Sequence, residues 1–518
     1  MSPQTNAPLA PALIEQVSQF VLKNVAAQVP GGRVPIDLPG YIDKIVAWAL
    51  TDDADHAEGA VLVAGSVHIP EALRWAAIEQ MKNFGVWRVK DTLPTLINSP
   101  AFPNCQYQVW DALYHHHGEY SADFIPWLKP FETELVDAGF PNGRKPRPQA
   151  SKRPLRVGVW SHKIGNYISS MNYVHPWLLN LPDKDTEVFI LSERRAADND
   201  PMHALYRQVF GKRLLECQGL ADKEFLKLAY GLDLDLMVIL QLVRPTVFHC
   251  RLSRCHLDFN ADLNVRNHCD MTLISQSMAV PELTEGTGRR FVVIPDPIFV
   301  SAHRPDVTLK ERNPADVFRF GAFCRALKFN EKTFDLWAAV LRACPAAELF
   351  CTGYGTLQKL KFLLDGAFAK RGVDPARVTV GSGVLPNAEH LDRYNSIDLV
   401  LDAYPLGSSV TSHDAFWMGV PQVYLGGDKR TSPLNTTMLL SLMGPEAGAC
   451  VSTPEEYVAY AKAHYEEGLR PKALREKLRA RNFQVPLYDN ARYTGLMRKV
   501  LHAAARLPSE KLTHISLD

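Results

Sequence analysis

The chain has 518 residues, of which 46% are hydrophobic and 22% are charged. That length exceeds what one hydrophobic core supports, so two or three domains are expected. The 57 Lys and Arg residues balance the 56 Asp and Glu residues to a formal net charge of +1. This balance gives no global electrostatic case for nucleic acid or an anionic membrane surface as a partner.

The sequence carries no feature typical of export or membrane insertion. Its nine cysteines lack the spacing of a disulfide framework, which suits a reducing cytosol. The first six residues, Met-Ser-Pro-Gln-Thr-Asn, lack the basic and apolar regions of a signal peptide. No run of 18 apolar residues is present, so no transmembrane helix is expected. A cytoplasmic location is predicted.

Residues 1–140 form the first block. Apolar residues such as Leu13, Val17 and Phe20 recur at three- and four-residue spacing, which predicts an all-α N-terminal domain. No period of 34 residues is visible, so tetratricopeptide repeats are not supported. Residues 141–154 are basic and proline-rich. They are interpreted as a solvated connector, with a docking arm for an acidic partner as the alternative.

A different pattern begins at Leu155, where short apolar runs alternate with helical ones. This alternation predicts a parallel sheet covered by helices in a Rossmann-like domain at 155–310. Prolines between 295 and 314 then mark a crossover. Strands are expected at 155–160, 187–191, 234–242, 271–274 and 291–294, and a helix at about 200–210.

A second α/β domain is predicted at 311–518, and a cleft between the two sheet domains would be the ligand site. Its strands are expected at 317–323, 347–352, 377–381, 398–402, 422–425 and 448–451. Its helices are expected at 330–343, 355–371, 387–395, 410–418, 433–442 and 454–466. Final helices near 470–482 and 488–505 are expected to pack back across the domains.

Residues 396–428 are the most informative segment. A buried strand at 399–401 is followed by a turn, and then by a hydroxyl cluster where a helix begins. Such a unit aims the bare N–H groups of the helix start beyond the carboxyl end of the strand, where they can bind phosphate. Asp414, one turn into the helix, could accept the two hydroxyls of a ribose. The alternative is an ordinary helix capped by Ser or Thr.

Histidine and cysteine pairs occur at 249–250, 255–256 and 268–269. Such pairs can bind metal, but their spacing does not fit the short knuckles of common zinc sites. Dispersed core and loop residues are the favoured interpretation, and zinc remains the alternative.

Four ordered motifs are similar to those of glycosyltransferase family 41, which holds the O-GlcNAc transferases and their Spindly-type relatives. The strongest is L-D-A-Y-P-L-G-S-S-V-T-S-H-D-A-F-W-M-G-V-P at 401–421. The others lie at 384–393, 323–337 and 156–167, and the resemblance covers roughly 155–505. The helical, non-repetitive N-terminal block looks closer to the cytoplasmic adhesin-modifying N-glucosyltransferases.

The resemblance implies a GT-B fold with two facing Rossmann-like domains. It implies inverting, metal-independent transfer of GlcNAc or glucose from a UDP-sugar to Ser/Thr or Asn of a partner protein. The UDP-sugar is a co-substrate, and no cofactor is expected.

The resemblance also implies roles for individual residues. Lys328 would neutralise the β-phosphate of the leaving nucleotide, and Asp414 would hold the ribose. His390 would stack on the pyrimidine, with Arg393 on the same helix face. The remaining nucleotide-sugar contacts are assigned to Arg325, Ser408, Ser409 and Thr411.

The sequence departs from the family pattern at several positions. Tyr167 occupies the place of a family histidine, so His162 is the candidate base, with Asp235 as the alternative. Ser409-Val410-Thr411 and Asn387 also differ, and both changes touch nucleotide contacts. Two other readings therefore remain: a catalytically weak or inactive GT-B protein that binds a partner, or a transferase with a non-protein acceptor.

Overall fold

The computed structural model describes residues 153–164, 173–194, 200–240, 252–259, 269–285, 290–302, 304–324, 328–353, 357–382, 385–426 and 434–516. The predicted helical block 1–140 lies outside the described residues, as does most of the predicted linker 141–154.

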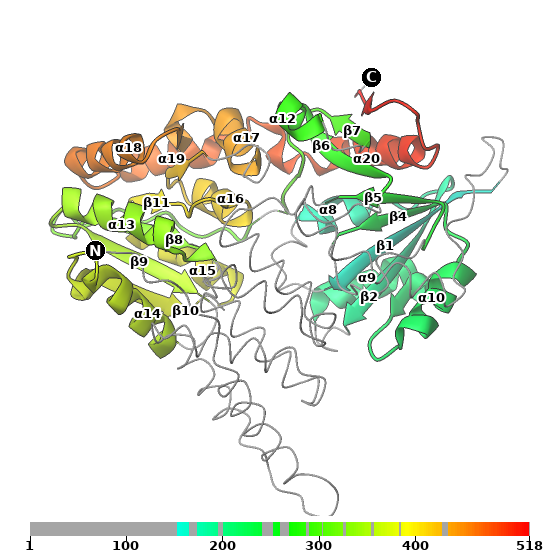
Figure 1. The fold of residues 1–518 in the computed structure, drawn as a ribbon, viewed down its shortest axis with the longest axis horizontal. Helices are drawn as coiled ribbons and strands as arrows, with labels where there is room; N and C mark the ends of the chain where they lie inside the picture. Colours follow the sequence, from blue (N-terminus) through cyan, green and yellow to red (C-terminus); the bar gives the residue numbers. More distant parts are fainter. Residues whose placement is uncertain are drawn as a thin grey trace, which may run out of the picture. The chain divides into compact units, whose positions relative to one another are not determined.

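The first sheet has eight strands in the order β14-β7-β6-β5-β4-β1-β2-β3, and every strand pair is parallel (Figure 1). Its central strands are buried along their whole length, as expected for a parallel sheet covered on both faces. The strands are β1 (Leu155–Lys163), β2 (Thr186–Arg194), β3 (Leu214–Glu216), β4 (Leu236–Ile239), β5 (Cys255–Asp258), β6 (Met271–Ser275), β7 (Arg290–Ile294) and β14 (Leu512–His514).

Helices alternate with these strands along the chain. α9 begins at Pro201, where the Asp200 carboxylate accepts from the amides of Met202 and His203. Such an N-cap satisfies two amides that the helix itself leaves unpaired. The helices are α8 (His175–Leu178), α9 (Pro201–Phe210), α10 (Asp222–Gly231), α12 (Pro281–Thr284) and α20 (Asn490–Ala504).

The second sheet has six strands in the order β10-β9-β8-β11-β12-β13. Order along the sheet differs from order along the chain, because the strand after β10 returns to the far side of β8. The strands are β8 (Arg319–Phe323), β9 (Glu348–Gly353), β10 (Val378–Ser382), β11 (Leu399–Leu401), β12 (Gln422–Leu425) and β13 (Gly448–Val451).

The helices of this region follow the predicted pattern. The predicted helix at 387–395 is an α-helix that continues as the 3-10 turn η8 (Arg393–Ser396). The others are α13 (Glu331–Ala343), α14 (Leu357–Ala369), α15 (Asn387–Asp392), α16 (Val410–Trp417), α17 (Leu434–Met443), α18 (Pro454–Glu467) and α19 (Lys472–Arg481). α19 packs against α16, and α20 packs against α8 and β7.

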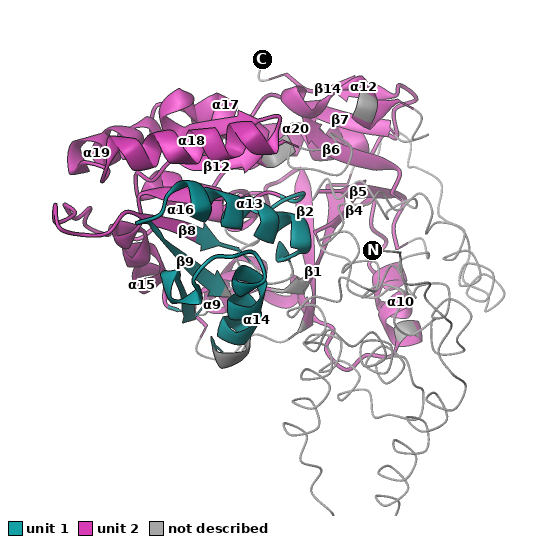
Figure 2. Cartoon of the chain, turned by 60° about the vertical axis from the view of Figure 1, so that its left-hand side comes forward, with its two compact units in different colours: residues 1–119, 322–385, 403–406 teal, residues 120–321, 386–402, 407–518 magenta. Residues whose placement is uncertain are grey.

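Chain contacts separate two compact units, coloured in Figure 2. The described part of one unit lies within residues 322–385 and 403–406. The described part of the other lies within 120–321, 386–402 and 407–518. No helix among the described residues combines the length and hydropathy needed to cross a bilayer.

The Cys255-His256 pair lies in β5, where both side chains are buried. Within the described ranges, no three His, Cys, Asp or Glu side chains gather closely enough to hold a metal ion. Cys269 is also buried, whereas His249, Cys250 and His268 lie outside the described residues.

Candidate functional site

The loop from β11 to α16 is organised by Asp402, a buried residue that follows the strand. Its Oδ2 accepts from the Ser408 amide at 2.7 Å and from Gln422 Nε2 at 2.6 Å. Its Oδ1 accepts from Ser408 Oγ at 2.7 Å. One carboxylate therefore fixes both ends of the loop.

Gly407 leaves no room for a side chain beside this carboxylate. A Cβ there would lie 2.6 Å from Thr436 Oγ1 and 2.7 Å from the Tyr424 ring. Thr436 Oγ1 donates to the carbonyl of Ser408. The loop is thus packed tightly just before the helix. Ser408 bonds to Asp402 and Thr436 within this packing and does not cap the helix.

The start of α16 has no side-chain cap. Ser409 occupies the N-cap position, but its hydroxyl donates to Tyr173 Oη at 3.1 Å and not to a helix amide. Among the described residues, no acceptor is placed on the amides of Val410, Thr411 and Ser412. The interpretation of an ordinary capped helix is therefore wrong for this element, and its first amides remain available to an anion.

Asp414 lies one turn further along α16 and is buried. Its Oδ1 accepts from Arg304 Nε at 2.7 Å, and its Oδ2 lies 3.4 Å from His390 Nε2. Burial raises the pKa of Asp414, but Arg304 and then His390 outweigh it and hold the pKa at about 2. The carboxylate is therefore ionised at neutral pH.

Arg304 comes from the segment that follows β7. Its Nη1 donates to Ser301 Oγ at 2.6 Å and to the carbonyl of Ala302 at 2.9 Å. Burial acts to lower the pKa of Arg304, and the Asp414 charge reverses this effect, so that the pKa is raised. The guanidinium is thus permanently charged and held by its own segment.

His390 on α15 lies beside Asp414. Its ring meets the Tyr394 ring edge-on, at 5.6 Å between centroids and 82° between planes. Tyr394 Oη donates to the Thr411 carbonyl at 3.4 Å. His390, Thr411 and Asp414 therefore lie in one cluster.

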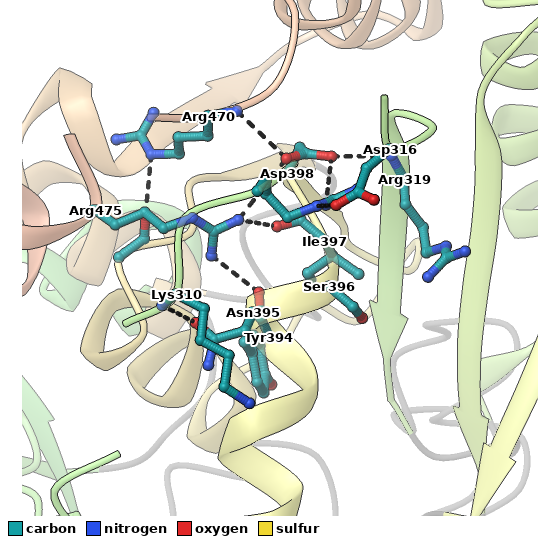
Figure 3. Close-up of polar contacts among 12 residues, drawn as sticks. Lys310, Asp316, Arg319, Tyr394, Asn395, Ser396, Ile397, Asp398, Arg470 and Arg475 are labelled. Carbon is teal, nitrogen blue, oxygen red and sulfur yellow. Dashed lines mark hydrogen bonds and ion pairs between the residues drawn. The ribbon is translucent and has the colours of Figure 1, made fainter. Parts of the chain in front are cut away.

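The segment after α15 is fixed by ion pairs to Asp398 (Figure 3). Arg312 Nη1 lies 2.9 Å from this carboxylate and Arg475 Nη2 lies 3.8 Å from it. Arg475 is fully buried, and its Nη1 donates to the Tyr394 carbonyl at 3.0 Å. This network holds η8, which carries Arg393 and the tyrosine beside His390. Burial lowers the pKa of Arg393.

Lys328 lies in the other unit, between β8 and α13. Its carbonyl accepts from Asn330 Nδ2 at 3.4 Å and from Thr333 Oγ1 at 3.3 Å. The same two side chains donate to the Tyr404 carbonyl, at 2.7 Å and 2.8 Å. The backbone of Lys328 is thereby held at a helix start, as predicted. Arg325 lies outside the described residues.

The acceptor-side candidates are less completely described. β1 is longer than predicted, so His162 lies within the strand and not just beyond it. Tyr167 lies outside the described residues. Asp235 precedes β4, where its carboxylate accepts from Arg153 Nη2 at 3.1 Å and from the Arg156 amide at 3.0 Å. These contacts favour a structural role for Asp235 at the amino end of the strand.

Sequence reasoning missed Arg304, Asp402, His413 and Tyr173. Arg304 is 110 residues from Asp414, and no local pattern links them. Asp402 did carry a signal, since an acidic residue directly after a buried strand is well placed to accept from the following turn.

Residues 294–497 match the sequence model of glycosyl transferase family 41. The probable UDP-N-acetylglucosamine–peptide N-acetylglucosaminyltransferase SPINDLY of Petunia hybrida is 27% identical over 230 residues, which cover 43% of this chain and 24% of the relative. The UDP-N-acetylglucosamine–peptide N-acetylglucosaminyltransferase of Caenorhabditis elegans is 30% identical over 151 residues, covering 29% and 12%. The chain thus spans about a quarter or less of the length of these curated relatives.

A mutant of the O-GlcNAc transferase of Thermobaculum terrenum has a similar structure, with a TM-score of 0.69 and 21% identity. The likeness covers 97% of this chain and 99% of that chain. It confirms the predicted GT-B fold. α15, α16, Arg304 and Asp402 all lie inside the matched family region. Residues 294–497 of this chain are thus similar to glycosyl transferase family 41.

Proposed function

We propose that the chain is an inverting, metal-independent protein glycosyltransferase of the cytoplasm. It transfers GlcNAc or glucose from a UDP-sugar to Ser/Thr or Asn of a partner protein. The observation that carries this proposal is the uncapped start of α16, followed one turn later by the buried carboxylate of Asp414. Both features lie inside the residues that are similar to a glycosyltransferase family.

The donor binds through the first turn of α16. The amides of Val410, Thr411 and Ser412 and the positive end of the helix dipole hold the pyrophosphate. The ionised carboxylate of Asp414 accepts from the ribose hydroxyls. His390 and Arg393, on neighbouring turns, contact the pyrimidine.

The transfer is a single displacement at the anomeric carbon. The acceptor oxygen or nitrogen attacks the face opposite the nucleotide, and the bond from the anomeric carbon to the β-phosphate oxygen breaks, so configuration inverts. The electron pair leaves with UDP. Lys328 neutralises the charge that grows on the β-phosphate, which lowers the energy of the transition state more than that of the bound substrate.

The acceptor must lose one proton during this step. His162 takes it directly from an acceptor hydroxyl, or positions an acceptor amide. The family resemblance places a histidine where this chain has Tyr167, so His162 is assigned this role from its position near the carboxyl end of β1.

The first test is a thermal-shift panel of UDP, GDP and dTDP sugars on the full chain, followed by measurement of transfer. Selective stabilisation by UDP-sugars is expected, because a ligand that binds only the folded state raises its stability. Transfer should survive chelation of metal ions by EDTA. Absence of both nucleotide binding and UDP release would instead favour the partner-binding alternative.

The second test is Lys328→Ala, which should abolish transfer while leaving UDP binding largely intact. Lys477→Ala is the control, because Lys477 is an exposed lysine paired with Glu446 on the surface. Turnover by Lys328→Ala at the wild-type rate would refute the catalytic assignment.

A further inference from the structure

We propose that Arg304 is a positioning residue for nucleotide recognition, and that it holds Asp414 so that one carboxylate serves both the ribose and His390. This inference rests on the proposed function, because it assumes that Asp414 binds the ribose of the donor. It adds a residue that does not touch the nucleotide but determines how well the nucleotide is recognised.

Arg304 is fixed before any ligand binds. Its side chain is 5% exposed, and three hydrogen bonds from its Nε and Nη1 engage Asp414, Ser301 and the Ala302 carbonyl. A guanidinium is planar and its donors point in set directions. The position of Asp414 Oδ1 is therefore determined by the segment at 301–304.

The carboxylate keeps capacity for a ligand while it is held. An ionised carboxylate offers about four acceptor positions on its two oxygens. Among the described residues, Arg304 occupies one position on Oδ1 and His390 faces Oδ2. The remaining acceptor positions match the two donors of a ribose diol.

The same carboxylate sets the orientation of His390. The contact between His390 Nε2 and Asp414 Oδ2 is made through the ring edge, and Tyr394 meets the ring at 82°. A contact through the edge nitrogen fixes the plane in which the ring lies, and that plane is the one that would stack on a base. Arg304 thus supports base stacking and ribose binding through one ion pair.

The competing explanation is a structural ion pair. Removing one partner of a buried pair destabilises a protein whatever its function, because a charge is left unpaired. The chain offers a matched control for this effect. Arg254, just before β5, is also a mostly buried arginine with a side chain 12% exposed, and its Nη1 pairs with Asp233 Oδ1 at 2.7 Å.

The test compares UDP with 2′-deoxy-UDP by isothermal titration calorimetry on the full chain. Wild type should bind UDP more tightly, because 2′-deoxy-UDP lacks one donor to Asp414. In Arg304→Gln, UDP binding should weaken about ten- to a hundredfold and 2′-deoxy-UDP binding should weaken less. The preference for UDP should therefore collapse. Arg254→Gln should lower Tm but keep the wild-type preference for UDP over 2′-deoxy-UDP.

The possible results distinguish a failure of the proposed donor site from a failure of the role assigned to Arg304. A wild-type chain that binds no UDP, or that does not distinguish the two nucleotides, refutes the ribose role of Asp414 and with it the proposed donor site. A wild-type preference that survives unchanged in Arg304→Gln overturns the role of Arg304 alone. If Arg304→Gln does not fold, the ratio of the dissociation constants for 2′-deoxy-UDP and UDP is measured in Arg304→Lys instead. Lysine keeps the positive charge but lacks the planar set of donors of the guanidinium.

Discussion

A buried neutral histidine stands next to the carboxylate at the start of α16. His413 is 1% exposed, and its Nδ1 has no hydrogen-bond partner among the described residues. Burial, and then the charge of Arg304, lower the pKa of His413 from 6.5 to about 3. The folded chain therefore resists protonation at a position where the unfolded chain accepts a proton.

We expect His413 to make stability fall with acid. Below pH 6.5 the unfolded state binds a proton that the folded state excludes until about pH 3. The loss is about 1.4 kcal/mol per pH unit in that window, or roughly 2 kcal/mol at pH 5. Urea unfolding at pH 7.5 and pH 5 should show a smaller difference in His413→Gln than in wild type. Equal differences would contradict the assignment.

At the residue scale, the sequence allows prediction of site residues that lie close together within one short segment. Thr411 and Asp414 were recognisable because a strand, a turn and a helix start follow one another within 396–428. Arg304 and Tyr173 were not, since they lie 110 and 236 residues from their partners Asp414 and Ser409. Only the tertiary fold brings such pairs together.

At the element scale, the loop before α16 depends on one carboxylate. Asp402 accepts from Ser408 twice and from Gln422 once. In Asp402→Asn the acceptor is no longer ionised, so the bonds that Ser408 and Gln422 donate to it lose their charge assistance. We expect a loss of about 2–4 kcal/mol in the free energy of unfolding, together with weaker UDP binding. Urea unfolding and calorimetry measure the two effects.

The control for Asp402 is a helix start that lies elsewhere on the chain. Thr453 caps α18, where its hydroxyl accepts from the Glu456 amide at 3.2 Å. Thr453→Ala should lower the free energy of unfolding by about 1 kcal/mol and leave UDP binding unchanged. If Asp402→Asn behaved like this control, its role in shaping the anion site would be wrong.

Gly419 at the end of α16 can be tested against a control glycine, Gly372, that has a similar backbone conformation. Gly419 has a φ of +67°, and a Cβ there would lie 2.2 Å from the Arg475 carbonyl oxygen. Gly372 has a φ of +71°, with nothing within 4 Å of the same added atom. Gly372→Ala should cost about 1 kcal/mol from backbone strain alone. Gly419→Ala should cost several times more, because α19 must move away from α16.

Thermal unfolding of the two alanine variants measures this difference. Similar Tm values would mean that α16 and α19 do not approach as closely as the structure has them. The sequence does not indicate this close approach, because Gly419 on its own predicts only the end of a helix. Long elements with strong periodicity were predictable, whereas β3 and β14 have three residues each and were missed.

At the scale of the whole molecule, the chain completes its first sheet with its last strand. β14 pairs with β7 in parallel, although all strands of the second sheet lie between them in sequence. The Phe291 amide donates to the Lys511 carbonyl at 2.8 Å, and the Ile515 amide donates to the Val293 carbonyl at 2.9 Å. The edge of β7 is therefore covered only after the rest of the described chain has been made.

Shortening the chain to Leu507 should expose this edge. The variant loses the backbone bonds of β14 and the contact from Arg290 Nη1 to the Pro508 carbonyl. We expect a loss of about 2–4 kcal/mol in the free energy of unfolding. We also expect concentration-dependent aggregation, because an uncovered strand edge pairs with other chains. Urea unfolding and light scattering measure the two effects.

A chain shortened to Ile515 keeps both pairing bonds and should behave as wild type. Since α20 ends at Ala504 and stays in both variants, a difference between them assigns the effect to β14 itself.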